Sequence, residues 1–181
     1  VVGAHMVLAL QTITSRNINP QESLVVSVTQ FHAGEAFNII PDTVMLKGTC
    51  RVFNNELQGT LPDRIQRIVD GVSSTFGAKS ELTYHKGYPA TINAEPQSKF
   101  CADVAKEIAG SENGVDLKPV PSMGAEDFSY MLQKRPGCYI WAGNGDSAGL
   151  HHPEYDFNDQ LLAVGASYWS RLVEQRLPKN I

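Results

Sequence analysis

Two adjacent histidines, His151 and His152, are the strongest candidates for chemistry in this sequence. They follow a glycine-rich loop at 143–149, which itself follows a predicted strand. Loops at strand ends are where α/β sheets place ligands, and imidazole commonly binds zinc and manganese. A metal site needs three or four ligands, however, and the sequence has no HExxH motif, no paired cysteines and no second histidine cluster. Spacing alone therefore leaves two interpretations of His151: a metal ligand, or a loop histidine bonded to backbone.

A second candidate is a polar sheet face around Arg51. In a strand over 44–53, alternation places Arg51 on the same face as Lys47 and Thr49. Asn38 lies in the segment just before this strand. Arginine is suited to bidentate binding of a carboxylate. The alternative is a solvated arginine on an exposed sheet.

A third candidate is the segment Ser122–Phe128. Gly124 permits a tight turn or a close backbone approach. Glu126 and Asp127 fall in the first turn of a helix predicted over 125–133, where carboxylates complement the helix dipole. That is a complete structural explanation, and the alternative is a loop that lines a substrate site.

The first half of the chain predicts the order α-β-β-α-β. Apolar residues at helical spacing begin at Val2, two strands follow at 24–31 and 44–53, and a last strand covers 81–85. One strand in front would complete β-α-β-β-α-β, the ferredoxin-like or split βαβ unit. Because the chain starts without Met, inside a predicted helix, we expect an incomplete ferredoxin-like domain cut from a longer protein.

The second predicted helix has clear end signals. Thr60 is expected to cap it, Pro62 to lie in its first turn, and Gly77 to close it.

Residues 87–91 interrupt the pattern and predict a boundary between a domain at 1–88 and a second at 89–181. Beyond the boundary helices alternate with strands, which predicts part of an α/β sandwich. The expected helices cover 95–109, 125–133 and 159–175, and the expected strands cover 115–120 and 137–142.

Composition excludes some classes of function. Net charge is −4 and the basic residues are scattered, which argues against nucleic-acid binding and against an RNA-binding sheet of the same topology. No apolar run of about 18 residues exists, so no membrane span is expected. Three widely spaced cysteines favour free thiols in a reducing compartment, and we expect a cytoplasmic protein.

Five segments, in order, resemble the metal-dependent amidohydrolase family of hippurate hydrolases, N-acyl-amino-acid amidohydrolases and auxin-conjugate hydrolases. The resemblance covers essentially the whole chain, and five ordered matches are far more specific than one. The segments are Ala9–Asn17, Val26–Thr29 with Ala36–Asp42, Gly48–Arg51, Gly124–Phe128, and Leu150–Pro153 with Tyr155–Asn158.

The resemblance implies a two-domain enzyme that cleaves the amide bond of N-acyl amino acids. A catalytic α/β domain binds two divalent metal ions, of zinc, manganese, nickel or cobalt, which activate a water for attack on the amide carbon. A ferredoxin-like lid is inserted into that domain and mediates homodimerisation. By resemblance, residues 1–88 correspond to the lid without its first strand, and 89–181 to the C-terminal portion of the catalytic domain.

Carried over by position, the resemblance makes His151 a metal ligand. It makes Asn38 and Arg51 substrate-binding residues and places Gly124 in a loop that lines the site. The remaining ligands and the general-base glutamate would lie before Val1, so no catalytic residue is assigned here. This chain alone is expected to be inactive and not to bind the full metal pair. The alternative is a non-catalytic ferredoxin-like dimerisation or binding module.

Overall fold

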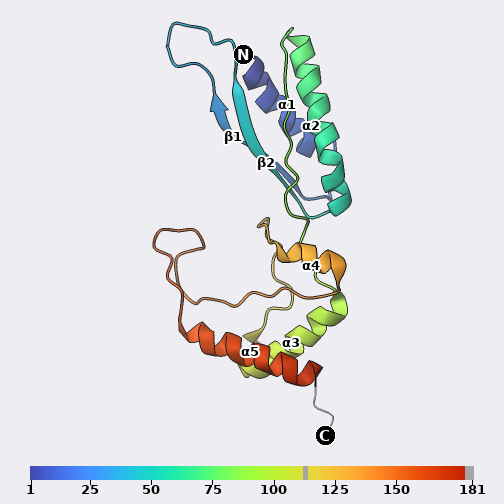
Figure 1. The fold of residues 1–181 in the computed structure, drawn as a ribbon, viewed down its shortest axis with the longest axis vertical. Helices are drawn as coiled ribbons and strands as arrows, with labels where there is room; N and C mark the ends of the chain where they lie inside the picture. Colours follow the sequence, from blue (N-terminus) through green and yellow to red (C-terminus); the bar gives the residue numbers. More distant parts are fainter. Residues whose placement is uncertain (112–113, 178–181) are drawn as a thin grey trace. The chain divides into compact units, whose positions relative to one another are not determined.

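The computed structural model describes residues 1–111 and 114–177, which form two compact units. The N-terminal unit comprises residues 1–90 with 123–126, and the C-terminal unit comprises the rest. The described residues form five helices and one two-stranded antiparallel sheet, a mixed α/β structure (Figure 1). The division after Ala90 falls two residues beyond the predicted boundary at 88.

In the N-terminal unit two helices cover one face of a β-hairpin (Figure 1). The elements are α1 Val2–Arg16, β1 Leu24–His32, β2 Met45–Val52 and α2 Asn55–Thr75. The strands pair from Leu24 opposite Val52 to His32 opposite Met45, with an irregularity between Val28 and Gln30. The predicted strands are therefore confirmed to within one residue at each end.

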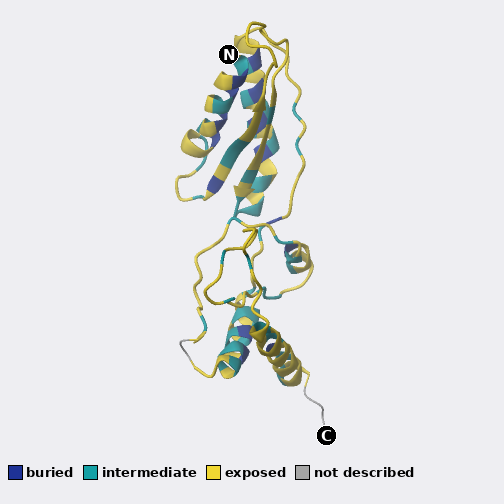
Figure 2. Ribbon diagram, turned by 90° about the vertical axis from the view of Figure 1, so that its left-hand side faces the viewer, coloured by how far each residue is buried: buried dark blue, intermediate teal, exposed yellow. Residues whose placement is uncertain are grey.

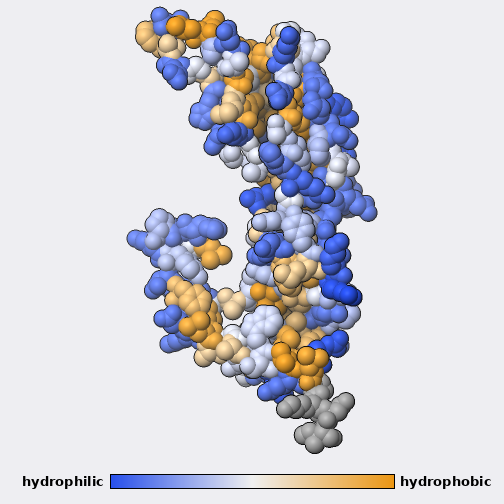
Figure 3. Space-filling model, in the orientation of Figure 1, coloured by the Kyte–Doolittle hydropathy of each residue, from blue (hydrophilic) through white to orange (hydrophobic). Residues whose placement is uncertain are grey.

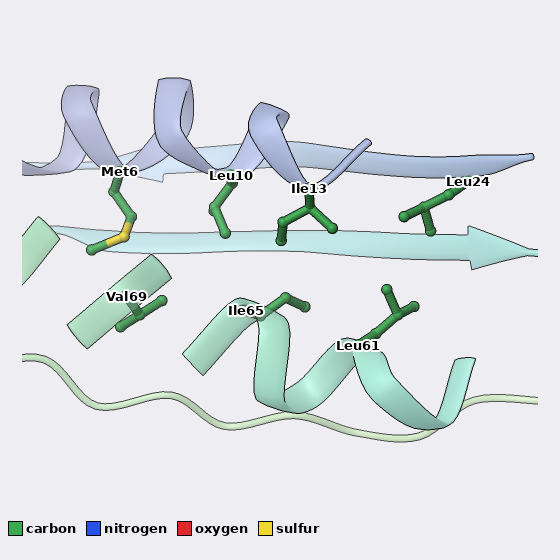
Figure 4. Close-up of a cluster of buried hydrophobic side chains, with 7 residues drawn as sticks. All are labelled: Met6, Leu10, Ile13, Leu24, Leu61, Ile65 and Val69. Atoms are coloured by element: carbon green, nitrogen blue, oxygen red, sulfur yellow. The ribbon is translucent and has the colours of Figure 1, made fainter. Parts of the chain in front are cut away.

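The core of this unit lies between the helices and the hairpin (Figure 2). The side chains at its centre come from α1, β1 and α2 and point toward one another (Figure 4). Alternation along β2 is also confirmed, because Cys50 and Val52 pack against the core while Lys47 and Arg51 are exposed. The central residues are Met6, Leu10, Ile13, Leu24, Leu61, Ile65 and Val69.

The predicted start of α2 was wrong. The helix begins at Asn55, because the side chain of Asn54 accepts hydrogen bonds from the backbone N–H groups of Glu56 and Leu57, at 2.9 and 3.1 Å. Thr60 therefore lies inside the helix, where its hydroxyl donates to the Leu57 carbonyl, and Pro62 is also internal.

The predicted end of α2 is confirmed at Gly77, which has a left-handed φ of 64°. The N–H groups of Gly77 and Ala78 donate to the carbonyls of Ser74 and Ser73, the pairing of a Schellman motif.

The segment 81–85 is not a strand in the structure. Its side chains Leu82 and Tyr84 pack against the core, and burial together with the nearby Cys50 thiol raises the pKa of Tyr84. A strand also needs a hydrogen-bonded backbone partner, and among the described residues the sheet contains only β1 and β2. The side chains of this segment therefore pack against the core, but its backbone does not pair with the sheet as predicted.

Gly48 gives a stability prediction. A Cβ at this position would overlap the backbone carbonyl oxygen of Ser27 on the paired strand. We expect Gly48→Ala to lower the free energy of unfolding by about 1–3 kcal/mol. The overlapping atom belongs to the backbone of the paired strand, which cannot move aside as easily as the end of a flexible side chain. Gly71→Ala is the matched control, since no atom lies within 4 Å of a Cβ there. In mid-helix it should stabilise by about 0.5–1 kcal/mol. Denaturant unfolding of both variants measures the contrast, and equal effects would contradict it.

In the C-terminal unit α3, Glu95–Ala109, packs against α5, Gln160–Arg176. The Arg171 guanidinium donates to the Glu107 carboxylate at 2.8 Å, and together with Gln175 it lowers the pKa of that carboxyl. The bounds of α3 agree with the prediction, and α5 is displaced by one residue. The shorter helix α4, Phe128–Lys134, starts three residues later than predicted, with Asp127 as its N-cap residue.

The strands predicted at 115–120 and 137–142 were wrong: both segments lack strand pairing in the structure. Residues 137–139 are instead tied to the start of α3. The Ala94 N–H donates to the Gly137 carbonyl at 2.9 Å, and the Asn93 amide makes two 2.8 Å bonds with the backbone of Tyr139. Within the described residues, no helix has the length and apolar character needed to cross a membrane.

Candidate functional site

His151 has an unusual backbone conformation. With a φ of 68° it is the one non-glycine residue in the left-handed region within 1–111 and 114–177. Histidine is enriched there relative to most residues, yet the conformation still costs energy, and such outliers cluster at functional sites. The side chain is exposed. The backbone therefore supplies evidence for a role of His151 that the spacing of residues did not.

The amide of Asn144 holds the loop that carries His151. Its nitrogen donates to the Asp156 carbonyl at 2.7 Å, and its oxygen accepts from the Asn158 N–H at 2.7 Å. One side chain thus joins the two ends of the loop, with Gly145 beside it at a φ of 84°. The sequence pattern did not predict this role of Asn144. The Asn144-Gly145 pair is a recognisable turn signal, but nothing in it identifies a partner twelve residues away.

His152 differs from His151 in its contacts. Its Nδ1 accepts a hydrogen bond from the backbone N–H of Glu154 at 3.1 Å, and the backbone N–H of His152 donates to the Gly149 carbonyl at 3.1 Å. The described residues provide no hydrogen bond to the His151 imidazole. His152 therefore fits the interpretation of a loop histidine bonded to backbone, whereas the ring of His151 is available for a ligand.

The donor set around His151 is too small for a metal centre. Across residues 1–111 and 114–177, no group of three or more His, Cys, Asp or Glu side chains is placed to hold a metal ion. An imidazole is the right kind of donor, but hydrolytic metal sites use about three protein ligands for each ion. One imidazole is too few for such a site, so the described residues do not form a metal centre by themselves.

Arg51 and the Gly124 segment lie together in the N-terminal unit. The Arg51 Nη1 donates to the backbone carbonyl of Met123 at 2.7 Å, across 72 positions of sequence. Residues 123–126 accordingly belong to this unit, although their neighbours on both sides in the chain belong to the other. Arg51 thus contacts the residue that precedes Gly124 in the chain. The Met123 carbonyl was missed, because backbone atoms carry no sequence signal.

Asn38 lies apart from Arg51. It is exposed in the loop 33–44 that joins β1 to β2, and this loop leads into β2 at Met45. Arg51 is near the other end of β2, about 20 Å further along the strand. The bulky side chains around Asn38 are also exposed, and Figure 3 shows hydrophobic residues at the end of this loop. Within the N-terminal unit, Asn38 and Arg51 therefore do not converge on one site.

A surface pocket where α1 ends and α2 begins contains none of the four predicted residues. Its Arg64 donates to the Asn17 carbonyl at 2.7 Å, and its Asn54 donates to Glu22 at 3.2 Å. These polar groups fix the helix ends, which accounts for their positions without a ligand.

Comparison with known proteins identifies relatives along almost the whole chain. The model of Peptidase family M20/M25/M40 matches residues 3–175. The chain is 36% identical to hippurate hydrolase of Campylobacter jejuni, covering 92% of this chain and 43% of that protein. It is 30% identical to IAA-amino acid hydrolase ILR1-like 4 of Arabidopsis thaliana, covering 98% of this chain and 42% of that protein. The chain therefore spans less than half the length of these relatives.

A solved structure shares the fold. The Bacillus subtilis YXEP protein, described as a dinuclear metal binding peptidase, matches with a TM-score of 0.73 and 27% identity. The match covers 97% of this chain and 45% of that one.

Proposed function

The chain belongs to peptidase family M20/M25/M40, and on this premise we propose that it is part of a metal-dependent amidohydrolase that cleaves the amide bond of N-acyl amino acids. The observation that carries the proposal is the strained, exposed His151 on a loop closed by Asn144. The names of the hippurate and IAA-amino acid hydrolases denote amides of an amino acid, which supports this substrate class. Three free cysteines support a cytoplasmic location.

The C-terminal unit has the surface expected of one portion of a larger catalytic domain. Several large apolar side chains are exposed on it, and where such side chains gather into a patch they mark a contact with further protein (Figure 3). The amide oxygen of Gln97 on α3 is buried and has no hydrogen-bond partner among residues 1–111 and 114–177. The exposed residues include Trp141, Leu150, Leu162 and Trp169.

For the N-terminal unit we propose a ferredoxin-like lid. The order α1, β1, β2, α2 and the packed segment 81–85 supports it. A further strand of the same protein would pair with an open edge of the hairpin and bring 81–85 into the sheet. We also propose that the lid forms a homodimer, with the exposed Phe37, Ile39 and Ile40 of the β1–β2 loop as contact residues. Sedimentation of the full-length protein tests the dimer.

The residues of this chain have distinct proposed roles. His151 offers an imidazole to one metal ion. Arg51 binds the carboxylate of the substrate, and its bond to the Met123 carbonyl holds the guanidinium in place. The segment at Gly124 lines the same site. The proposed substrate contact of Asn38 from the lid requires a different substrate molecule from the one that Arg51 of the same chain binds, because the two residues lie toward opposite ends of β2.

An activity assay of the full-length protein tests the proposal. We expect hydrolysis of benzoyl- and acetyl-amino acids that a chelator abolishes and that added divalent zinc, manganese, nickel or cobalt restores. The 181-residue chain alone should show no hydrolysis. A full-length protein without bound metal and without metal-stimulated hydrolysis would favour the alternative, a non-catalytic ferredoxin-like module.

A further inference from the structure

Two cysteines of the C-terminal unit meet in a cluster that the proposed hydrolytic site does not use. Cys101 on α3 is buried, and Cys138 in the segment after α4 is half-buried. In addition to burial, the neighbouring Cys101 thiol raises the pKa of Cys138, and both thiols help to raise the pKa of the buried Tyr168 on α5. The Ser98 side chain also interacts with Cys138 and acts on that pKa in the opposite direction. The third cysteine, Cys50, lies in the N-terminal unit.

The backbone holds the two thiols together. Ala94, Ser98 and Cys101 fall at i, i+4 and i+7 and so share one face of α3. The segment with Cys138 is fixed along that face, because the Ala94 N–H donates to the Gly137 carbonyl at 2.9 Å. On the other side of Cys138, the Asn93 amide makes two 2.8 Å bonds with the Tyr139 backbone. Bonds on both flanks of Cys138 therefore keep it against α3.

We propose that Cys101 and Cys138 form a reversible disulfide, a modification site that responds to low-molecular-weight disulfides such as oxidised glutathione. The half-buried Cys138 reacts first. Its thiolate attacks one sulfur of the oxidant, forms a mixed disulfide and releases one small thiol. The Cys101 thiolate then attacks the Cys138 sulfur and releases the second. Two protein thiols are oxidised, the small disulfide is reduced to two thiols, and the protons from the cysteines pass to the departing thiolates.

The environment makes the reaction slow. Burial raises the pKa of the Cys138 thiol, and the Cys101 thiol adds to this, while the Ser98 side chain acts in the opposite direction. Only the thiolate reacts, so little of it is present at neutral pH. The rate of cross-linking should therefore rise about tenfold per pH unit while the pH stays below the pKa of the attacking thiol.

Peptide mapping of the full-length protein tests the disulfide. The folded protein is incubated with oxidised glutathione and then alkylated and digested with trypsin under non-reducing conditions. We expect one cross-linked pair, Phe100–Lys106 with Arg135–Arg171, lighter than the sum of its peptides by two hydrogen atoms. A thiol reductant should restore both free peptides.

Three serine variants provide the controls. Cys101→Ser and Cys138→Ser should each abolish the cross-link, with glutathione trapped on Cys138 in the first. Cys50→Ser should leave it unchanged. Stable glutathione adducts on both cysteines of the unsubstituted protein, a cross-link that involves Cys50, or no reaction at high pH in the folded protein would overturn the proposal.

Discussion

Replacing His151 by Asn in the full-length protein should lower its metal content and reduce amide hydrolysis by at least about 100-fold, since loss of even an outer-shell partner of a metal ligand costs 10–100-fold. Asparagine is the informative choice, because it tolerates the left-handed backbone that the structure shows at this position. The substitution removes the imidazole without forcing the loop to refold.

The adjacent histidine gives a matched control. The Nδ1 of His152 accepts a backbone hydrogen bond from Glu154, which is a structural contact. We expect His152→Ala to retain bound metal and most of the activity. Metal content by mass spectrometry and initial rates at saturating substrate measure both variants. Full metal content and full activity in His151→Asn would show that His151 is not a ligand.

Comparing two substitutions at His151 distinguishes loss of the imidazole from loss of the loop conformation as the cause of reduced activity. His151→Ala places a β-carbon with poor left-handed propensity at this position and should weaken the loop as well as the ligand. If His151→Asn and His151→Ala lose activity equally while their thermal midpoints differ, the imidazole is the cause. If activity follows the thermal midpoint instead, the loop conformation is the cause.

Local signals explain why some elements were predictable and others were not. The bounds of α3 follow from Pro96 near its start and Gly110 just past its end, which has a left-handed φ of 66°. Both signals act within a few residues of the helix. The start of α2 was misplaced because Asn54 and Thr60 are both acceptable caps, and the choice depends on which side chain is directed at free N–H groups.

Strands depend on partners that a sequence pattern does not contain. Residues 24–31 and 44–53 were predictable because they pair with each other. The segments 81–85 and 137–142 carry equally strand-like residues, but they make no strand pairing in the structure. Leu82 and Tyr84 of the first segment nevertheless pack against the core, whereas Ile140 and Trp141 of the second are exposed. Hydrogen-bond pairing is a property of two segments, and a pattern within one segment does not fix it.

The candidate site also depends on contacts that the sequence pattern does not contain. The residue types of His151 and Arg51 were enough to propose a metal ligand and a carboxylate-binding residue. The left-handed backbone at His151, the Asn144 bonds and the Met123 carbonyl required coordinates, because each arises from contacts distant in sequence or from main-chain atoms. The side chains were therefore predictable from the sequence, whereas the contacts that orient them were visible only in the structure.

Replacing Arg51 by Ala should lower kcat/KM for N-acyl amino acids by about 10–100-fold, the value of one charge-assisted hydrogen bond of roughly 1.5–3 kcal/mol. Arginine has five N–H donors, and the Met123 carbonyl engages one nitrogen, Nη1. Donors on the other nitrogens remain for a substrate carboxylate. The bond to Met123 therefore orients the guanidinium and leaves its other N–H donors free to bind a substrate carboxylate.

A substrate pair distinguishes binding of the carboxylate from positioning of the loop. If Arg51 binds the carboxylate, Arg51→Ala should impair an N-acyl amino acid far more than the corresponding N-acyl amino acid amide, which lacks that charge. If Arg51 acts through Met123, both substrates should suffer equally, because the loop at Gly124 moves for each. Lys47→Ala, which removes an exposed cation from the same face of β2, is the control for general electrostatic attraction.

Arg51→Lys extends the comparison. Lysine keeps the positive charge but presents it on a single ammonium group. An ammonium lacks the planar donor geometry with which a guanidinium bonds the Met123 carbonyl and binds a carboxylate at the same time. We expect it to recover less than half of the activity lost in Arg51→Ala, mainly through a raised KM. Complete recovery would mean that charge alone is needed, and an unchanged kcat/KM in Arg51→Ala would remove Arg51 from the site.

The bond between Arg51 and the Met123 carbonyl joins residues 72 positions apart in the sequence. Its loss in Arg51→Ala should therefore also increase the rate of proteolysis at residues 123–126.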